Sequence, residues 1–345
     1  MRDLHLTVDA VQRNCHVADA RHARDAALCT YLLAMREQFR WEHELPLAAP
    51  PSRAELGRWM TEREALWEDL ESSDFASVPV AGKRHDPFDA ATINRTLVPE
   101  GLVYGAGLGR LGRPHFFLGQ LERAESRDGL TVLVSGCEYA RDIVSLPGAL
   151  QGDTVYIRRD ALRRLLWDRI ELWESRRYSG PLASALEHFG WRDDRDAALE
   201  QMLDAALETV ILHELGERAA TERLGPGWDA MLAQLRGVRA EALARAVRDN
   251  LADCLSTLPV LADRASPGPI DLYAAMFEGL RRELFPRLVA AHAAADLGAL
   301  RAASEAGAGH WTRAGRLVLD AFGSAAGGES ALERLLGGER TALKL

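Results

Sequence analysis

The sequence predicts an α+β protein that is mostly helical. Apolar residues recur at helical spacing from Thr7 to about Leu45 and again after Arg159, whereas short β-favouring runs broken by glycine lie between these parts. The 345-residue chain is 47% hydrophobic and 27% charged, as ordinary globular proteins are. We therefore expect a helical N-terminal region, a small central antiparallel sheet and a helical C-terminal domain.

The sequence of the N-terminal region predicts three helical segments. The stripe of apolar residues between Thr7 and Leu45 indicates one long helix or two consecutive helices. Ser52 and Glu55 form a capping box, in which each side chain bonds an amide of the first turn, so a helix should run from here to about Leu70. A third helix is expected to begin with Pro87 at its first position.

The central sheet is predicted from four short runs of β-branched and aromatic residues. These runs are Leu102-Val103-Tyr104, His115-Phe116-Phe117-Leu118, Leu130-Thr131-Val132-Leu133-Val134 and Val155-Tyr156-Ile157. Residues 107–112 fit the G-x-G-x-x-G pattern of dinucleotide-binding proteins, but a strand-like run follows where a helix would be needed. We therefore expect a β connection at these glycines and no nucleotide cofactor.

The remainder of the chain reads as helical. One helix should open near Asp193 or Asp194 and stop at Gly225, and another should span about Val238 to Leu258 and end before Pro259. Three more helical segments follow, around 271–285, 288–303 and 311–322. The Gly-, Ser- and Pro-containing stretch 144–153 is the predicted boundary, which gives domains 1–150 and 151–345.

Composition and charge exclude several classes of function. The net charge of −9 gives no general attraction to nucleic acid or anionic lipid. No run approaches the roughly 20 apolar residues of a membrane-spanning helix, and no signal peptide is recognisable, so we expect a cytoplasmic protein. The four cysteines lie singly, without a Cys-x-x-Cys pair, and are expected to be buried thiols. The sequence leaves the oligomeric state open.

One short motif points to metal chemistry. His213 and Glu217 are four residues apart on a predicted helix, so both can reach one cation while Glu214 projects from the adjacent side. The related zinc hydrolase motif His-Glu-x-x-His uses two imidazoles as ligands and the intervening Glu as general base. Here a carboxylate replaces the second imidazole, which favours harder cations, so manganese or ferrous iron join zinc as candidates.

The segments Leu212-His213-Glu214-Leu215-Gly216 and Asp249-Asn250-Leu251-Ala252-Asp253 locally resemble the gluzincin metallopeptidases. In that family a downstream helix supplies an acidic third ligand, and an Asp four residues later orients a ligand histidine. The resemblance implies that Asp249 is the third ligand beside His213 and Glu217, that Asp253 orients His213, and that Glu214 is catalytic. The sequence departs from the family in that Glu217 replaces a histidine and Asp249 replaces a Glu.

A second group of polar residues lies near the N-terminus. His16, Asp19 and His22 are spaced three residues apart, so neighbouring pairs share a helix face, but one ion touching all three would require a bent helix. Hydrogen bonding to packed neighbours is therefore favoured over a metal or catalytic role. The sequence does not decide their role.

Across nearly its full length the chain resembles an uncharacterised family of bacterial proteins. The resemblance is carried by residues 9–15, 28–33 and 113–119 and by the segments around His213 and Asp253. It implies an N-terminal and a C-terminal part but no activity.

Two functions from different classes follow. In the first, a divalent cation held by His213, Glu217 and Asp249 supports hydrolysis of an amide or similar bond in a small molecule or peptide, or marks a degenerate site that only binds metal. In the second, the chain is a non-enzymatic interaction or regulatory protein, and the carboxylates only hold arginines such as Arg218, Arg245 and Arg248.

Overall fold

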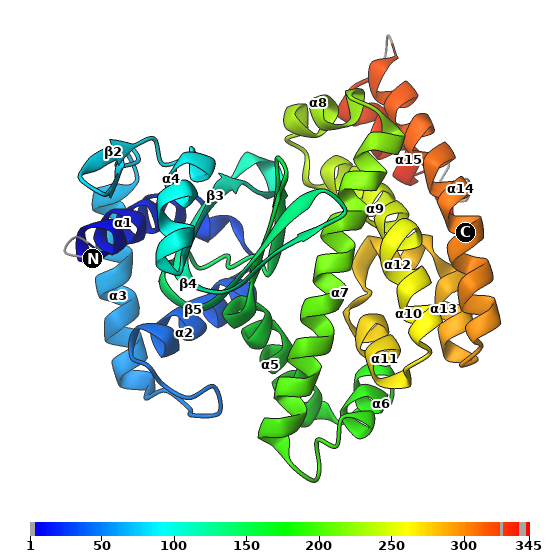
Figure 1. The fold of residues 1–345 in the computed structure, drawn as a ribbon, viewed down its shortest axis with the longest axis horizontal. Coiled ribbons are helices and arrows are strands. Elements are labelled where there is room, and N and C mark those ends of the chain that lie inside the picture. Colours follow the sequence, from blue (N-terminus) through cyan, green and yellow to red (C-terminus); the bar gives the residue numbers. More distant parts are fainter. Residues whose placement is uncertain (1–3, 325–326, 338–342) are drawn as a thin grey trace. The chain divides into compact units, whose positions relative to one another are not determined.

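The computed structural model describes residues 4–324, 327–337 and 343–345, which form two compact units (Figure 1). Unit 1 comprises the chain up to Ser126, Thr131–Pro147 and Tyr156–Trp167. Unit 2 comprises Arg127–Leu130, Gly148–Val155 and the chain from Asp168 onwards. The predicted class is confirmed, because helices predominate and the strands pair into a small sheet and a larger one.

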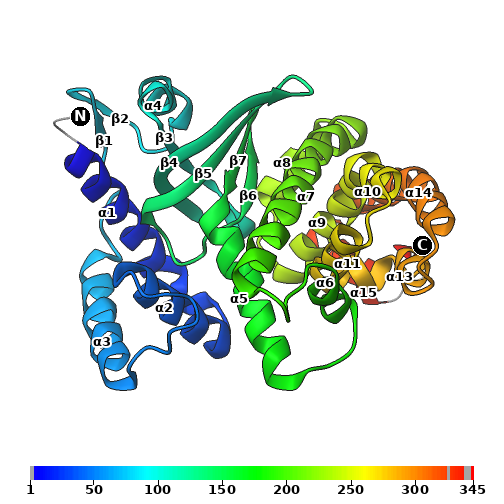
Figure 2. The same cartoon turned by 60° about the horizontal axis from the view of Figure 1, so that its bottom comes forward.

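Unit 1 begins with three long helices: α1 (Leu4–His22), α2 (Leu28–Glu42) and α3 (Arg53–Leu70), with a 3-10 turn at Ala23–Asp25 after α1. Figure 2 shows these helices grouped beside the strands. The predicted cap of α3 is confirmed, since the Ser52 side chain accepts a hydrogen bond from the Glu55 amide.

The third predicted helix begins later than expected. Helix α4 spans Ala90–Leu97, and the Asp89 side chain caps it by accepting a hydrogen bond from the Thr92 amide. The start at Pro87 was wrong because the Asp86 side chain accepts a hydrogen bond from the Phe88 amide, which holds Pro87 in a turn before the helix.

Two sheets are present in the described residues, and β1 pairs with β2 and β3 with β4 in antiparallel fashion. Strands β1 (Val78–Val80) and β2 (Lys83–His85) form a hairpin that the sequence did not predict, because both are short and β2 is strongly charged. The larger sheet has the order β3-β4-β5-β7-β6. Its strands are β3 (Leu102–Leu108), β4 (Pro114–Arg127), β5 (Leu130–Arg141), β6 (Gly148–Gln151) and β7 (Thr154–Arg158).

The four predicted β runs lie within β3, β4, β5 and β7. The glycines of residues 107–112 end β3 and lead through a 3-10 turn at Arg110–Gly112 into β4, as expected for a β connection. Strands β3 and β4 pair in register from Leu102 opposite Gln120 to Leu108 opposite Pro114. A 3-10 turn at Val98–Glu100 precedes β3. Strand β6 was not predicted, because it lies in the stretch 144–153 that is predicted to be the domain boundary.

The core of unit 1 covers both faces of its strands. On one face Val11 and Cys15 of α1 pack in a cluster with Phe116 and Leu118 of β4. On the other, Phe117 packs in a separate cluster, where its ring lies edge-on to that of Tyr156.

Cys15 and Cys254 are buried, whereas Cys29 and Cys137 are exposed, so the expectation of four buried thiols was wrong for two of them.

Unit 2 is built around one long helix. Helix α5 (Arg159–Arg176) leads into it and α6 (Pro181–His188) follows. Helix α7 (Arg195–Leu224) has its Asp194 cap and its stop at Gly225, both as predicted, with Asp194 accepting a hydrogen bond from the Ala197 amide. Helix α8 (Gly227–Gln234) follows the C-terminal end of α7, and most of the later helices lie on one side of α7 (Figure 1). These later helices are α9 (Val238–Ala252), α10 (Leu258–Arg264), α11 (Pro267–Met276), α12 (Gly279–Leu284), α13 (Pro286–Ala293), α14 (Leu297–Gly323) and α15 (Glu329–Gly337).

Helix α9 does not stop before Pro259 as expected. A π-helical turn at Asp253–Thr257 joins it to α10, and the helical path continues to Arg264. The prediction was wrong because a π-helical turn directly precedes α10, and Pro259 lies in the first turn of that helix, a position that accommodates proline. Trp228, Phe285 and Trp311 form the centre of the unit 2 core.

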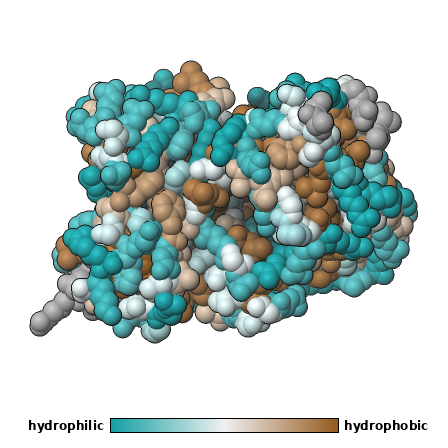
Figure 3. Space-filling model, turned by 90° about the horizontal axis from the view of Figure 1, so that it is seen from above, coloured by the Kyte–Doolittle hydropathy of each residue, from teal (hydrophilic) through white to brown (hydrophobic). Residues whose placement is uncertain are grey.

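Within the described residues, every helix is too short or too polar to cross a membrane. The face drawn in Figure 3 carries mostly hydrophilic residues, with separate apolar areas and not one continuous apolar surface. No large apolar docking face is therefore visible on this side of the molecule.

Candidate metal centre

The close approach of α7 and α9 positions the candidate site. A Cβ atom built on Gly216 would lie 2.4 Å from the Ala252 carbonyl oxygen, so only glycine permits this helix contact. Gly216 lies next to Glu217, and Ala252 lies next to Asp253. The contact therefore brings the two motif-bearing helices together at the motifs.

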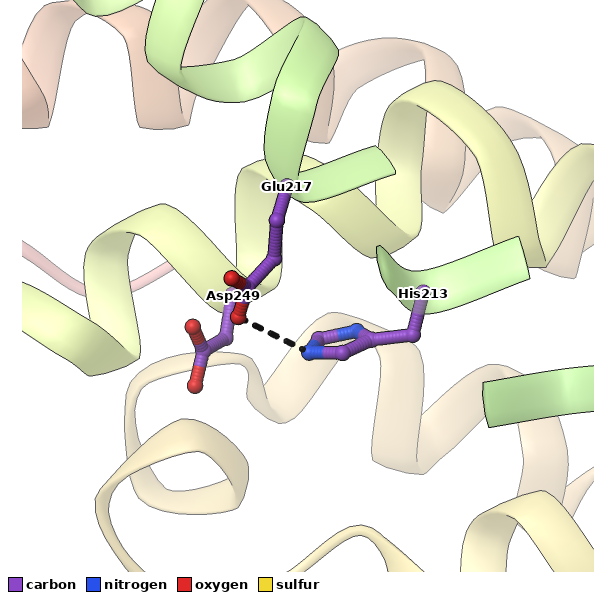
Figure 4. A group of neighbouring side chains, drawn as sticks. All are labelled: His213, Glu217 and Asp249. Carbon is purple, nitrogen blue, oxygen red and sulfur yellow. Dashed lines mark ion pairs between the residues drawn. The ribbon is translucent and has the colours of Figure 1, made fainter. Parts of the chain in front are cut away.

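His213, Glu217 and Asp249 converge on one region of space (Figure 4). One potential ligand atom from each lies within 4.8 Å of the other two. His213 and Glu217 come from α7, and their Nε2 and Oε1 atoms are 3.5 Å apart. Asp249 reaches the same region from α9. Their roles as ligands stay a prediction, but their spatial grouping is the one that metal binding requires.

The other ring nitrogen of His213 is held by Asp253. His213 Nδ1 lies 2.7 Å from Asp253 Oδ1. Asp253 is buried, and its second oxygen accepts a hydrogen bond from Tyr273 Oη at 2.7 Å and another from Arg281. A carboxylate that fixes a histidine in this way leaves Nε2 directed at a cation, as is common in metal sites.

The charges of the site are strongly coupled. Burial alone would lower the pKa of His213, but the Asp253 carboxylate and the hydrogen bonds to Asp253 and Glu217 raise it well above its usual value. Burial would raise the pKa of Glu217, but Arg248 and then His213 lower it to about 2. Without a cation the site therefore holds a protonated imidazole facing an ionised carboxylate.

Arg248 would compete with a bound cation for the carboxylates of Glu217 and Asp249. Its Nη2 donates to Glu217 Oε1 at 2.5 Å and to Asp249 Oδ1 at 3.0 Å. Both carboxylates of the candidate ligand set thus already contact a guanidinium group. A metal ion has to displace Arg248 or share these carboxylates with it.

Glu214 lies beside this group in a different electrostatic state. The residue is buried, and burial together with the Glu217 charge raises its pKa to about 8. A Cβ atom on Gly148 of β6 would lie 2.9 Å from Glu214 Oε1, so the absence of a side chain there lets β6 cover the carboxyl. Glu214 can therefore exchange a proton near neutral pH, as a general base must.

A cavity of ≈ 550 Å³ opens beside the group. Glu217 and Arg248 lie on its wall, together with Leu150 and Gly152 from the β6–β7 hairpin. Its remaining lining is mostly polar or charged and includes Arg218, whose guanidinium bonds Glu222 and Asp153. A cavity of this size and polarity suits a polar small molecule or a peptide segment.

The N-terminal residues His16, Asp19 and His22 do not form a metal-ligand group, as far as the described residues show. His16 contacts Arg63 Nη1, at 2.8 Å from Nε2, and burial followed by the Arg63 charge lowers its pKa to about 3. The Asp19 carboxylate accepts from the Ile143 amide at 3.2 Å. His22 lies 3.4 Å from Asp25. His16 and Asp19 therefore contact packed neighbours, whereas His22 contacts an exposed carboxylate.

Three residues of the centre were not predicted from the sequence. Tyr273 and Arg281 donate hydrogen bonds to Asp253, and Gly148 lies against Glu214. Neither Tyr273 nor Arg281 lies at a recognisable spacing from the motif. Gly148 carried only the signal of a break between elements, and that signal led to a predicted domain boundary.

The comparisons with known proteins identify a family without a known activity. Residues 6–158 match the family of unknown function (DUF6866) N-terminal domain, and residues 163–338 match the family of unknown function (DUF6866) C-terminal domain. No curated protein and no solved structure matches the chain, so the likeness to gluzincins rests on two short segments alone. The matches cover most of the sequence, and the chain belongs to the DUF6866 family.

Proposed function

We propose that unit 2 is a metal-dependent hydrolase that binds a divalent cation through His213, Glu217 and Asp249. The observation that carries this proposal is the convergence of one ligand atom from each residue to within 4.8 Å of the others. Two helices that are distant in sequence contribute to the group. Metal–oxygen and metal–nitrogen bonds are about 2.0 to 2.2 Å long for zinc, so modest closure of the side chains would enclose an ion.

The state of His213 sets how the cation binds. With its pKa raised, the imidazole is protonated in the metal-free chain, and the ion has to displace the Nε2 proton. Cation affinity therefore rises with pH until His213 has lost this proton. One imidazole and two carboxylates form a hard, anionic donor set, which favours Mn²⁺ or Fe²⁺ beside Zn²⁺.

Glu214 is the proposed general base. A bound divalent cation lowers the pKa of a coordinated water, and a neighbouring carboxylate then accepts the proton as the water attacks. Glu214 is adjacent to the ligand residues and has a pKa of about 8 without a cation. An incoming cation would favour its ionised form, because opposite charges attract. The local likeness to gluzincins supports an amide or similar bond as the substrate. Bacterial source and cytoplasmic location remain predictions.

The contacts of Arg248 support a second candidate function, that of a non-enzymatic protein in which these charges form a structural network. In this candidate Arg248 itself balances Glu217 and Asp249, as its two hydrogen bonds indicate. Arg218 and Arg245 also pair with carboxylates of their own helices, Glu222 and Glu241. The two candidates differ in whether His213 ever binds an ion.

Metal analysis by mass spectrometry separates them. Wild type, His213→Ala, Glu214→Gln and a control, His5→Ala at an exposed position, are purified and supplemented with Zn²⁺, Mn²⁺ or Fe²⁺ in turn. We expect stoichiometric metal in all but His213→Ala, and hydrolysis of test amides that is lost in Glu214→Gln although its metal is retained. Wild type that stays free of all three metals would contradict the proposal and favour the structural network.

A further inference from the structure

Unit 1 contains a cavity of ≈ 770 Å³ that the proposed hydrolase chemistry does not use. Its wall is formed by side chains of α1, α2, the loop after α2, α3, β5 and the start of α5. Small-molecule sites typically enclose about 300 to 1,000 Å³, so the cavity has the size of a ligand site. His16, which the sequence singled out, is one of its lining residues.

Arg141 on this wall has a buried nitrogen without a hydrogen bond. The residue is 1% exposed. Its Nε donates to Gln38 Oε1 at 2.9 Å, its Nη2 donates to the Glu37 carbonyl at 2.7 Å, and its guanidinium stacks 4.6 Å above the Trp41 ring. Nη1 finds no acceptor in the described part of the chain. An unsatisfied buried donor on a charged group is costly, so its position at a cavity wall indicates an acceptor supplied by a ligand.

The cavity lining carries both signs of charge, with five arginines and five carboxylate side chains, of which Glu138 is one. Glu138 is fully buried and is the carboxylate nearest to Arg141 Nη1, at 3.9 Å. The same carboxylate accepts from Arg158 at 2.5 Å and contacts Arg164 at 3.3 Å. One carboxylate therefore serves three guanidinium groups. An anionic ligand would add a second counter-charge at this point of the wall.

The apolar part of the lining favours an organic ligand over a bare ion. Trp41, Leu45 and Leu47 line the cavity beside the charged residues. A bare inorganic ion would leave these side chains in contact with water only. An organic molecule with an apolar body and one anionic group satisfies both parts of the wall.

We propose that this cavity binds a small organic anion, whose carboxylate or phosphate accepts a hydrogen bond from Arg141 Nη1 and whose apolar body lies against Trp41. The anionic group thereby supplies the acceptor that the chain does not. Trp41 supplies a flat apolar surface, and Arg164 adds a second positive charge at the wall.

Calorimetric titration of the full chain tests the proposal with three probes of similar shape: phenylacetate, phenyl phosphate and neutral phenylacetamide. At least one anion should bind with a Kd of about 1 mM or tighter and at least about tenfold more tightly than the amide. Binding of one anion only would identify its group as the chemistry recognised. Arg141→Gln should weaken anion binding about tenfold or more, whereas Arg95→Gln, at an exposed position on α4, should leave it unchanged.

Two further measurements address variants that fail to fold. Leu47→Asp places a negative charge on the half-buried loop wall and should weaken the anions but not the amide. Hydrogen exchange on wild type with a saturating anion should protect residues 37–47 and 137–141. Equal binding of the amide, no binding of either anion, or anion binding without protection of these segments would each overturn the assignment.

Discussion

Glu138 in unit 1 and Glu217 in unit 2 are both buried or half-buried carboxylates that accept hydrogen bonds from arginine, and each has a second carboxyl nearby with a raised pKa. Burial and the Glu217 charge raise the pKa of Glu214 to about 8. Burial and the Glu138 charge raise the pKa of Asp160 to about 6. Both units thus combine a carboxylate held by arginine with a second carboxyl whose ionised form is destabilised.

The third partner differs between the units. Glu217 faces the imidazole of His213 and, through Arg248, a second carboxylate, so unit 2 gathers groups that donate electron pairs. Glu138 contacts three guanidinium groups besides having the Asp160 carboxyl nearby, so its ion-pair partners in unit 1 are proton donors. A buried carboxylate alone therefore indicates no function. Its remaining neighbours decide whether the site suits a cation or an anion.

The largest expected effect is that of Glu138→Gln. This change leaves Arg141, Arg158 and Arg164 without their shared counter-charge, and breaking a buried ion pair costs about 3 to 5 kcal/mol in the free energy of unfolding. Urea denaturation measures the loss. The surface pair of Arg24 with Glu68 provides the control, since Glu68→Gln should cost less than about 1 kcal/mol.

The corresponding substitution in unit 2 is that of Glu217. Glu217→Gln should cost less than Glu138→Gln, because Arg248 keeps Asp249 as an acceptor. If Glu217→Gln is equally destabilising or more so, the two carboxylates have the same structural role and the distinction between the units fails.

A smaller effect is expected from Gly216→Ala. The new Cβ would lie 2.4 Å from the Ala252 carbonyl oxygen, so α7 and α9 must separate. Overpacking of this kind costs about 1 to 3 kcal/mol. The separation also moves His213 and Glu217 away from Asp249 and should weaken cation binding, as measured by titration with Mn²⁺ and Zn²⁺.

Gly57→Ala is the matched control for this variant. Gly57 also lies inside a helix, but nothing lies within 4 Å of a Cβ built there. Its substitution should stabilise the chain by about 0.5 to 1 kcal/mol. Unchanged cation affinity in Gly216→Ala would show that the helix contact does not set the geometry of the centre.

The two regions also differ in how far the sequence reveals them. His213, Glu214 and Glu217 lie within five residues of one helix, so helical spacing alone predicts that two of them share a face. Asp249 and Asp253 were added through a resemblance, and the structure places both beside the first group. The interpretation as a non-enzymatic protein named Arg248 among the arginines held by these carboxylates, and Arg248 contacts both Glu217 and Asp249. Spacing alone did not show which carboxylates this long side chain reaches.

The cavity of unit 1 and the contacts of Arg141 could not be predicted from residue spacing. Arg141 and Gln38 are 103 positions apart and meet only because β5 packs beside α2. Most long helices and the four main strands followed from periodicity and caps, whereas the short helices α6, α8 and α15 were not predicted. The hairpin of β1 and β2 and the strand β6 depend on tertiary pairing. Local patterns thus predicted most of the elements, and long-range packing determined the second site.

The smallest expected effect concerns Asp160, the unit 1 counterpart of Glu214. Its folded-state pKa of about 6 lies above the ordinary 3.8, so between these values the folded chain keeps a proton that the unfolded chain releases. The contribution of Asp160 to stability is therefore complete below pH 3.8 and is lost as the pH rises towards 6. Asp160→Asn removes this dependence, because the amide does not ionise.

Relative to wild type, Asp160→Asn should gain about 1 to 2 kcal/mol in the free energy of unfolding between pH 4 and pH 7. Urea denaturation at both pH values measures this difference, with Asp69→Asn on the exposed face of α3 as the control. The gain should shrink in the Glu138→Gln background if that variant folds, because the Glu138 charge is the second cause of the raised pKa. A gain of the same size there would mean that burial alone acts on Asp160, and the parallel with Glu214 and Glu217 would no longer hold.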